Sequence, residues 1–397
     1  MTPPTDPRTL RRREQARKRT ARHRGLALGV AAVAAAGIGL WLGGRASDDD
    51  DPAEPESAGS APPSCPREIA SDPRKLAGQA LMVRFEGTAT PELIRAARRG
   101  EIGGLIAFPP AGLAAGTIRE AIERMQRAAR EGGNAPLLVA TDQEGGDVKR
   151  FPQAPPDLGP AELANADEAA ALAEGRATGR YLRRLGINVD LAPVLDLGLP
   201  GSFVASRTFG PDPASVATVG IAFASGLEEA GVAATAKHFP GLGRATVNTD
   251  LGPSAVDASR RELAIDLEPF RAAVDAGVPL VMTSNATYPI YGGDTPASLA
   301  TRITTGLLRN RLGFDGVVIT DDLLAGAISG AGSTPGEAAV AAARAGADVL
   351  LFARLPAPEA LPALVAALRN GSLDTEALRD SCARNLALRE SLTPSSP

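Results

Sequence analysis

The chain has 397 residues, of which 44% are hydrophobic and 4% aromatic, and its formal net charge is −4. This length suits one or two domains, because an α/β barrel uses about 250 residues as a single domain. The slightly acidic balance, the few aromatic side chains and the lack of a basic stripe after the N-terminus argue against nucleic acid as a partner.

The first 64 residues predict a membrane segment followed by a linker. Residues 1–24 form an arginine-rich basic tail, and residues 25–44 are an uncharged apolar run. About 20 apolar residues can cross a bilayer as a helix, and the preceding positive charge keeps the N-terminus in the cytoplasm. Residues 45–64 are acidic and rich in Pro and Ser, which predicts a disordered linker.

We expect residues 25–44 to be an uncleaved anchor in the cell membrane, with the rest of the chain outside the cytoplasm. A signal peptide whose cleavage releases a secreted protein is the alternative, although no A-x-A-like cleavage site is obvious. A buried core helix is disfavoured, because no neighbouring segment is able to bury it.

The two cysteines lie at the two ends of the predicted folded domain, residues 65–397. In an oxidising compartment, a disulfide between Cys65 and Cys382 is the expected use, and two unpaired thiols are the alternative. We expect no metal site, because the cysteines are far apart and the two histidines are His23 and His238. We also expect no cofactor.

Apolar runs alternate with amphipathic stretches from about Ala77 onward. The expected strands are Gly78–Phe85, Ile102–Phe108, Pro136–Thr141, Ile187–Leu191, Val232–Ala236, Val278–Thr283, Gly316–Thr320 and Asp348–Phe352. The expected helices include Ile118–Glu131, Glu168–Leu185, Ser215–Glu229, Arg260–Ala276, Gly336–Ala345, Pro356–Asn370 and Asp374–Leu392.

Eight strands that alternate with helices predict an α/β TIM-type (β/α)8 barrel, preceded by the membrane segment and the linker. A doubly wound open sheet is the alternative. Such a sheet often carries a glycine-rich nucleotide fingerprint after its first strand, and residues 85–88 contain none.

Polar and ionisable side chains gather after several of the predicted strands, where a barrel builds its active site. They belong to residues 141–150, 188–196, 206–210, 237–238, 283–285 and 320–322. Each group taken singly has an ordinary interpretation, such as a turn, a helix cap, a surface ion pair or a buried hydrogen bond. Because all of them fall at one end of the predicted barrel, we interpret them together as a site.

Three stretches resemble glycoside hydrolase family 3, and most of all its single-barrel β-N-acetylhexosaminidases. They are Asp142–Gly146, Lys237–Gly241 and Gly313–Leu323. The resemblance covers roughly residues 76–352. It implies a retaining hydrolase of β-linked N-acetylhexosamine glycans, such as fragments of the cell wall, that works through a glycosyl-enzyme intermediate.

The resemblance also implies roles for single residues. Asp321 matches the nucleophile, and a carboxylate there can form the covalent intermediate. Five residues match positions that hold the sugar: Asp142, Arg150, Arg207, Lys237 and His238. The implied partner is a carbohydrate substrate, and a monomer is the default expectation.

One loop departs from the family pattern. Where the hexosaminidases carry a histidine the chain has Leu242, and in place of their Asp-x-His general acid/base dyad it has Asn248 and Asp250. Ser284 and Asn285 replace the usual Ala-His pair.

Asp250 is therefore the candidate acid/base. An unperturbed Asp has a pKa near about 3.9, so loop closure and a neighbouring charge would have to raise the pKa of Asp250. The alternative function is a barrel that binds wall glycans without hydrolysing them. A Schiff-base aldolase using Lys237 and a metal-dependent amidohydrolase fit worse, because the first needs no Asp321 and the second needs paired histidines.

Overall fold

A computed structural model of the protein describes residues 64–354 and 359–393, which belong to one compact unit. The predicted basic tail, the membrane segment and residues 45–63 of the linker lie outside the described residues. Within the described ranges, no helix is long and apolar enough to cross a membrane.

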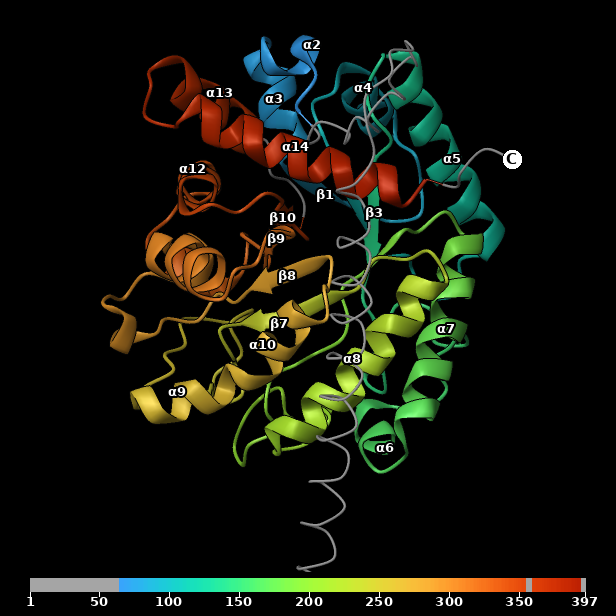
Figure 1. The fold of residues 1–397 in the computed structure, drawn as a ribbon. Helices are drawn as coiled ribbons and strands as arrows, with labels where there is room; N and C mark the ends of the chain where they lie inside the picture. Colours follow the sequence, from blue (N-terminus) through green and yellow to red (C-terminus); the bar gives the residue numbers. More distant parts are fainter. Residues whose placement is uncertain (1–63, 355–358, 394–397) are drawn as a thin grey trace, which may run out of the picture. The chain divides into compact units, whose positions relative to one another are not determined.

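Eight parallel strands form the centre of this unit (Figure 1). They are β1 (Leu81–Phe85), β2 (Gly104–Ala107), β3 (Leu138–Thr141), β6 (Val189–Asp190), β7 (Thr235–Phe239), β8 (Leu280–Thr283), β9 (Val317–Thr320) and β10 (Leu350–Phe352). They form two sheets, in the orders β10-β1-β2-β3-β6 and β7-β8-β9. Parallel bridges join the edges of the two sheets, from Val189 to Ala233 and from Ile319 to Val349. The ring of strands is closed, which confirms the predicted barrel and rules out the open sheet.

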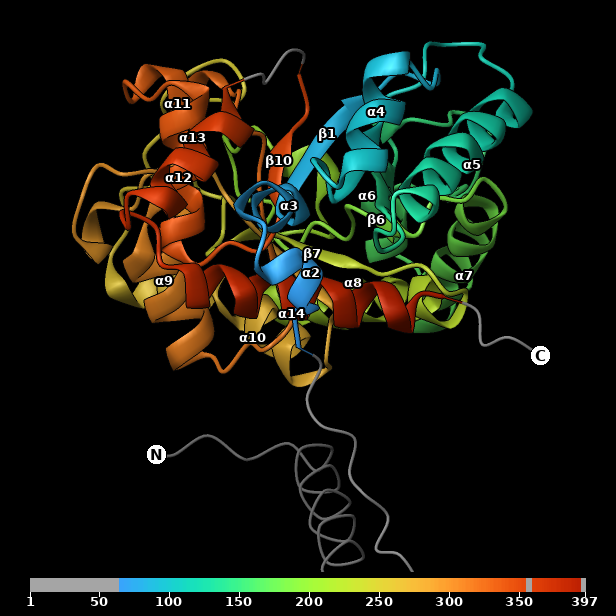
Figure 2. The same cartoon turned by 90° about the horizontal axis from the view of Figure 1, so that it is seen from above.

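Helices surround the ring of strands on the outside, as both ribbon views show (Figures 1 and 2). They are α2 (Arg67–Ala70), α3 (Pro73–Gln79), α4 (Pro91–Arg99), α5 (Ala115–Glu131), α6 (Pro160–Ala164), α7 (Glu168–Arg184), α8 (Pro213–Glu229), α9 (Arg260–Asp266), α10 (Glu268–Asp275), η4 (a π-helix, Arg302–Arg311), α11 (Gly326–Gly330), α12 (Pro335–Ala345), α13 (Ala360–Arg369) and α14 (Thr375–Ser391), with short 3-10 turns η1 (Ala205–Arg207), η2 (Pro289–Tyr291) and η3 (Ala297–Leu299).

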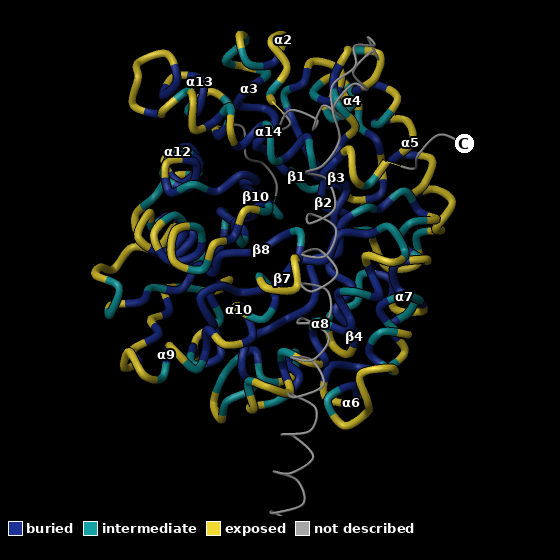
Figure 3. The backbone as a smooth tube through the Cα atoms, viewed as in Figure 1, coloured by how far each residue is buried: buried dark blue, intermediate teal, exposed yellow. Residues whose placement is uncertain are grey.

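Apolar side chains fill the space inside the barrel and the layer between strands and helices. The interior contains residues from alternate strand positions, among them Met82, Ile106, Leu138, Val189, Met282 and Ile319. The strands are dark and buried in Figure 3, while the outer sides of the helices are exposed. Both faces of each strand are thus covered, which is why the central strands are continuous buried runs.

The fifth strand is displaced from its predicted position. The apolar pattern predicted Val232–Ala236, whereas β7 spans Thr235–Phe239. Lys237 and His238 therefore lie within the strand rather than after it. The apolar pattern ends at the first charged residue, Lys237. This lysine is tolerated inside a strand because carboxylates from other parts of the chain pair with it, and the local sequence does not show them.

The predicted helix Arg260–Ala276 is two helices, α9 and α10, which meet at Leu267. Pro269 lies at the start of α10, and proline has no N–H to continue the hydrogen-bond pattern of a preceding helix. Ser259 caps α9, because its side chain accepts a hydrogen bond from the Glu262 backbone N–H. The start of the first predicted strand was also wrong, because Gly78 and Gln79 belong to α3.

The amino end of the barrel is covered by α14, whose Asn385 donates to the Asp348 carbonyl oxygen at 2.8 Å. Arg389, one turn later, donates to Gln79 Oε1 at 2.6 Å. Gln79 and Asp348 come just before β1 and β10. The opposite end of the barrel, where the strands finish, is thus left to the connecting loops.

Cys65 and Cys382 are joined by a disulfide, with their Cα atoms 5.4 Å apart. The bond links the segment before α2 to α14 and spans 317 residues of sequence. It ties the first described residues to the helix that covers the amino end of the barrel.

Removing this disulfide is expected to destabilise the barrel. Because the cross-link restricts the unfolded chain, reduction or Cys65→Ser should lower the free energy of unfolding in urea by about 2–4 kcal/mol. Cys65 is the residue to change, because Cys382 is buried and a serine there would add an unpaired hydroxyl. Equal unfolding midpoints for the oxidised and reduced wild type would contradict this expectation.

Candidate active site

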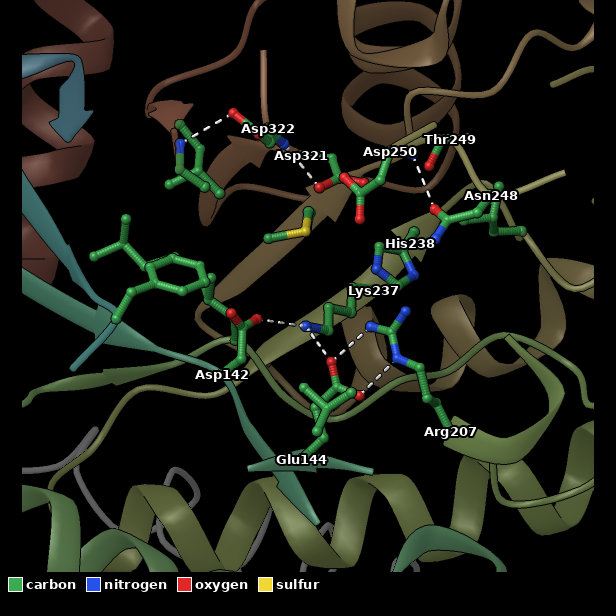
Figure 4. A pocket seen from close by; sticks show the side chains of 18 of the residues that line it. Asp142, Glu144, Arg207, Lys237, His238, Asn248, Thr249, Asp250, Asp321 and Asp322 are labelled. Carbon is green, nitrogen blue, oxygen red and sulfur yellow. Dashed lines mark hydrogen bonds and ion pairs between the residues drawn. The ribbon is translucent and has the colours of Figure 1, made fainter. Parts of the chain in front are cut away.

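A cavity of about 370 Å³ opens at the carboxyl ends of the barrel strands (Figure 4). Seven residues singled out in the sequence line it together: Asp142, Arg150, Arg207, Lys237, His238, Asp250 and Asp321. They come from segments after β3, β6, β7 and β9 and from β7 itself. The barrel therefore gathers residues that are up to 179 positions apart in the chain (142 to 321) into one cavity.

A tight hairpin after β3 shapes one wall of the cavity. Its strands β4 (Gln143–Gly145) and β5 (Val148–Lys149) pair antiparallel. Gly145 and Gly146 turn the chain with φ angles of +97° and +55°, which glycine adopts without a Cβ clash. The hairpin brings Arg150 back to Asp142, whose carbonyl oxygen accepts from the Arg150 backbone N–H at 3.1 Å.

Lys237 lies between two carboxylates at the centre of the cavity floor. Its Nζ is 2.6 Å from Glu144 Oε1 and 3.1 Å from Asp142 Oδ1. Arg207 donates to both oxygens of Glu144, with distances of 2.9 Å and 2.7 Å. Arg150 donates to Asp142 Oδ2 at 3.1 Å. Three cations and two carboxylates thus form one network. Figure 4 shows the part of it that joins Asp142, Lys237, Glu144 and Arg207.

The network keeps these buried groups ionised. Burial opposes the charge of Glu144, but Lys237 and Arg207 outweigh it and lower the pKa of this carboxyl to about 2. Burial likewise opposes the charge of Lys237, but Glu144 and Asp142 outweigh it and raise the pKa of the ammonium. The cavity floor therefore presents fixed charges and hydrogen-bonding groups, which suits a polyhydroxylated ligand.

His238 is held by a buried carboxylate on its outer side. Its Nδ1 donates to Asp196 Oδ2 at 2.6 Å, and the same carboxylate accepts from the backbone N–H groups of His238 and Leu242. Asp196 is fully buried. This arrangement fixes the imidazole, with its other ring nitrogen as the polar group left for the cavity.

Asp321 follows directly after β9 and faces the cavity. Its Oδ1 accepts from the Asp322 backbone N–H at 2.7 Å. Desolvation raises the pKa of the Asp321 carboxyl, His238 opposes this effect, and the Asp250 carboxylate adds to it. The last contribution places Asp250 and Asp321 within electrostatic reach of each other.

The loop between β7 and α9 carries Asp250 to the cavity mouth. Figure 4 shows the Asp250 side chain pointing toward Asp321, above the His238 ring. Asn248 Oδ1 accepts from the Asp250 backbone N–H at 2.9 Å, so Asn248 shapes the turn. The Asp250 side chain is 53% exposed and forms an ion pair with Arg354.

Ser284 and Asn285 have structural partners. Asn285 Nδ2 donates to the Asp322 carbonyl oxygen at 2.7 Å, and Ser284 Oγ bonds to the Tyr288 hydroxyl at 2.9 Å. Both residues are buried and neither lines the cavity. They support the backbone behind Asp321.

Three residues of this site received no role from the sequence. Glu144 and Asp196 lie in stretches already noted as polar, and the signal that could have singled them out is a carboxylate next to a predicted strand end. Arg354 follows β10 as an isolated arginine, and nothing near it in the sequence distinguishes it. Within the described residues, no cluster of three His, Cys, Asp or Glu side chains is arranged to hold a metal ion.

Comparison with known proteins shows one family along most of the chain. The model of the glycosyl hydrolase family 3 N terminal domain matches residues 75–388. An uncharacterized secreted glycosyl hydrolase of Arthroderma benhamiae is 37% identical over 82% of this chain and 95% of its own length. A beta-hexosaminidase of Stenotrophomonas maltophilia is 36% identical over 66% of this chain and 79% of its own.

Two solved structures have similar folds. A glycoside hydrolase family 3 beta-N-acetylglucosaminidase from Paenibacillus sp. is 36% identical with a TM-score of 0.77, and the match covers 80% of this chain. This chain spans 62% of that protein. A beta-N-acetylhexosaminidase from Beutenbergia cavernae is 34% identical with a TM-score of 0.74, over 80% of this chain and 98% of its own.

Asp190, at the end of β6, generates a prediction about stability. It is fully buried, its Oδ1 accepts from the Gln143 backbone N–H, and its Oδ2 has no partner among the described residues. Desolvation raises the pKa of this carboxyl to about 8 from an ordinary value of 3.8. The folded protein then binds one more proton than the unfolded chain between these pH values, so stability falls as pH rises.

Asp190→Asn removes this proton linkage while keeping an oxygen that can accept from Gln143. The free energy of unfolding of the variant, relative to wild type, should rise by about 1.4 kcal/mol per pH unit between about pH 4 and 8. Urea unfolding at several pH values measures it, with Asp294→Asn as a control for the loss of an exposed carboxylate. A difference that does not change with pH would refute the assignment.

Proposed function

The chain belongs to glycosyl hydrolase family 3, and on this basis we propose that it is a retaining hydrolase of β-linked N-acetylhexosamine glycans. The relatives named as beta-hexosaminidase and beta-N-acetylglucosaminidase support this activity. The observation that carries the proposal is the pair of carboxyl groups, Asp321 and Asp250, that meet above a floor of fixed charges. Cell-wall fragments are the proposed source of the sugar.

The cavity floor holds the sugar in the proposed reaction. Asp142, Arg150, Arg207, Lys237 and His238 offer donors and acceptors to its hydroxyl groups. The ion pairs among them, and the Asp196 contact to His238, fix these groups before substrate arrives. A site of buried polar groups discriminates strongly against ligands that lack the matching hydroxyls.

Asp321 is the proposed nucleophile. Its carboxylate attacks the anomeric carbon, the bond to the aglycone oxygen breaks, and a glycosyl-enzyme ester forms. The hydrogen bond from the Asp322 N–H orients the carboxylate for this attack. Burial raises the pKa of the Asp321 carboxyl, and His238 and Lys237 oppose this rise in favour of the ionised form that the attack needs.

Asp250 is the proposed acid/base. In the first step its carboxyl gives a proton to the departing aglycone oxygen. In the second step its carboxylate takes a proton from the water that attacks the anomeric carbon, the ester bond to Asp321 breaks, and the sugar leaves. The position on an exposed loop, opposite Asp321, suits both transfers because aglycone and water enter from the cavity mouth. Asp250 thus stands where the histidine of the hexosaminidases would act.

We place the barrel outside the cytoplasm. The name of the fungal relative, a secreted glycosyl hydrolase, and the Cys65–Cys382 disulfide support this location. Attachment through residues 25–44 and a monomeric state remain part of the proposal. A barrel that binds glycans without cleaving them is not favoured, because the named relatives are hydrolases and a second carboxylate takes the place of the missing dyad.

Substitution of each of the two carboxyl groups should affect the hydrolysis of an aryl N-acetylglucosaminide with a good leaving group in a different way. Asp321→Asn should lose turnover by a factor of about 10⁴ or more, because no ester forms. Asp250→Asn should keep the first step, accumulate a glycosyl-enzyme on Asp321 and show a burst of released phenol followed by slow turnover. Mass spectrometry of the intact protein measures the trapped sugar.

Wild-type protein that binds wall fragments but does not cleave the aryl substrate would overturn the hydrolase proposal. Burst kinetics that persist in Asp321→Asn would instead refute that residue as nucleophile.

The pH dependence of kcat/KM provides an independent check. Its acid limb reports ionisation of Asp321 in the free enzyme. The Asp250 carboxylate contributes to the raised pKa of Asp321, so removing its charge should lower this pKa. With the activated substrate, the acid limb of Asp250→Asn should lie at lower pH than that of wild type, and a limb at unchanged or higher pH would contradict the assigned pairing.

A further inference from the structure

The last residue before the undescribed segment 355–358 lies in the cavity and has no role so far. Arg354 follows β10, which neighbours β1 in the ring, and it lines the cavity together with Asp250 and Asp321. Its guanidinium makes contacts with two separate segments. This double attachment distinguishes it from an ordinary surface arginine.

One contact reaches the acid/base loop. Arg354 Nη2 is 3.0 Å from Asp250 Oδ1. The contact involves one carboxylate oxygen only, which leaves Oδ2 to carry the proton that the proposed reaction transfers. The guanidinium on Oδ1 also restricts rotation of the Asp250 carboxyl group. Without this contact the exposed side chain would be free to turn in water.

The other contacts reach the segment after the nucleophile. Arg354 Nη1 donates to the Leu324 carbonyl oxygen at 2.9 Å, and its Nε is 3.6 Å from Asp322 Oδ2. Asp322 in turn accepts from the Ala353 backbone N–H at 3.0 Å, so the residue before Arg354 is tied to the same carboxylate. The guanidinium is therefore anchored to the neighbour of Asp321.

We propose that Arg354 is a positioning residue for the reaction, holding the Asp250 carboxyl over the nucleophile Asp321. The inference rests on the proposed function, since it assigns a role toward Asp250 as the acid/base. A surface ion pair of this exposure contributes little to stability, because water screens it. The role of Arg354 is thus to orient a side chain rather than to hold the fold.

The backbone of the loop has its own attachments, which makes the proposal testable. The Asp250 carbonyl oxygen accepts from Gly326 N–H at 3.0 Å, and the Thr249 carbonyl oxygen accepts from Ala327 N–H at 2.9 Å. These bonds fix the loop against α11 without Arg354. A variant at position 354 should therefore fold and keep the loop in place while the Asp250 carboxyl is free to turn.

The readout is the dependence of kcat/KM on the leaving group. An acid in the correct position accelerates departure of a poor leaving group, whereas a good leaving group departs with little help from it. A purely structural role would affect both substrates by the same factor. The experiment compares a dinitrophenyl with a methyl β-N-acetylglucosaminide, using the full-length protein.

Arg354→Met should lower kcat/KM about tenfold with the methyl glycoside, a part of the 10²–10⁴-fold that general acid catalysis contributes. With the dinitrophenyl glycoside the loss should be less than about twofold. Arg354→Lys retains a cation and should recover most of the activity toward the methyl glycoside. Arg98→Met, which breaks an ion pair of similar exposure with Glu131 far from the cavity, should change neither value.

Equal losses with both substrates, or no loss with the methyl glycoside, would overturn the role of Arg354 and leave the proposed function standing. Failure of the wild type to cleave even the dinitrophenyl glycoside would overturn the proposed function, and this inference with it. Selective loss with the methyl glycoside in Asp250→Asn but not in Arg354→Met would show that Asp250 acts without the help of Arg354.

Discussion

The ion pair between Lys237 and Glu144 is the interaction on which the rest of the site depends. A lone ammonium at this depth would be strongly disfavoured, and so would two adjacent carboxylates without a cation. Lys237 is tolerated because Glu144 and Asp142 reach it from the segment after β3, and Arg207 reaches Glu144 from the loop after β6. The network thus connects three parts of the barrel rim and decides where each of its members points.

The site has two parts: a buried floor that is suited to binding the sugar and a more exposed mouth where the proposed acid/base lies. The floor is buried, and its side chains are held by ion pairs and by the carboxylate of Asp196 behind His238. The mouth carries Asp250 and Arg354, which are each about half exposed. Such a division suits a glycosidase, because the sugar must be oriented closely while aglycone and water exchange at the mouth.

The loop between β7 and α9 carries the proposed acid/base. Asn248 accepts a hydrogen bond from the Asp250 backbone N–H and so shapes its turn, and Asp250 is the proposed acid/base. Burial raises the pKa of the Asp321 carboxyl, and the Asp250 carboxylate adds to this rise. Arg354, which follows β10, brings a cation to Asp250 and to Asp322, although it lies far from Asp250 in the chain.

The sequence by itself determined the barrel and most members of its site. The spacing of apolar residues and the number of predicted strands predict a closed α/β barrel. The charged residues that follow the apolar runs predict which side chains gather in the site, because parallel strands end on the same side of a barrel. It did not determine the true extent of β7, the break at Pro269, or the roles of Glu144, Asp196 and Arg354. A buried charge next to an apolar run looks like the end of a strand until its counter-charges are known. Only the tertiary structure brings Glu144 to Lys237 and Arg354 to Asp250, since these pairs are 93 and 104 residues apart and electrostatic energy depends on distance in space.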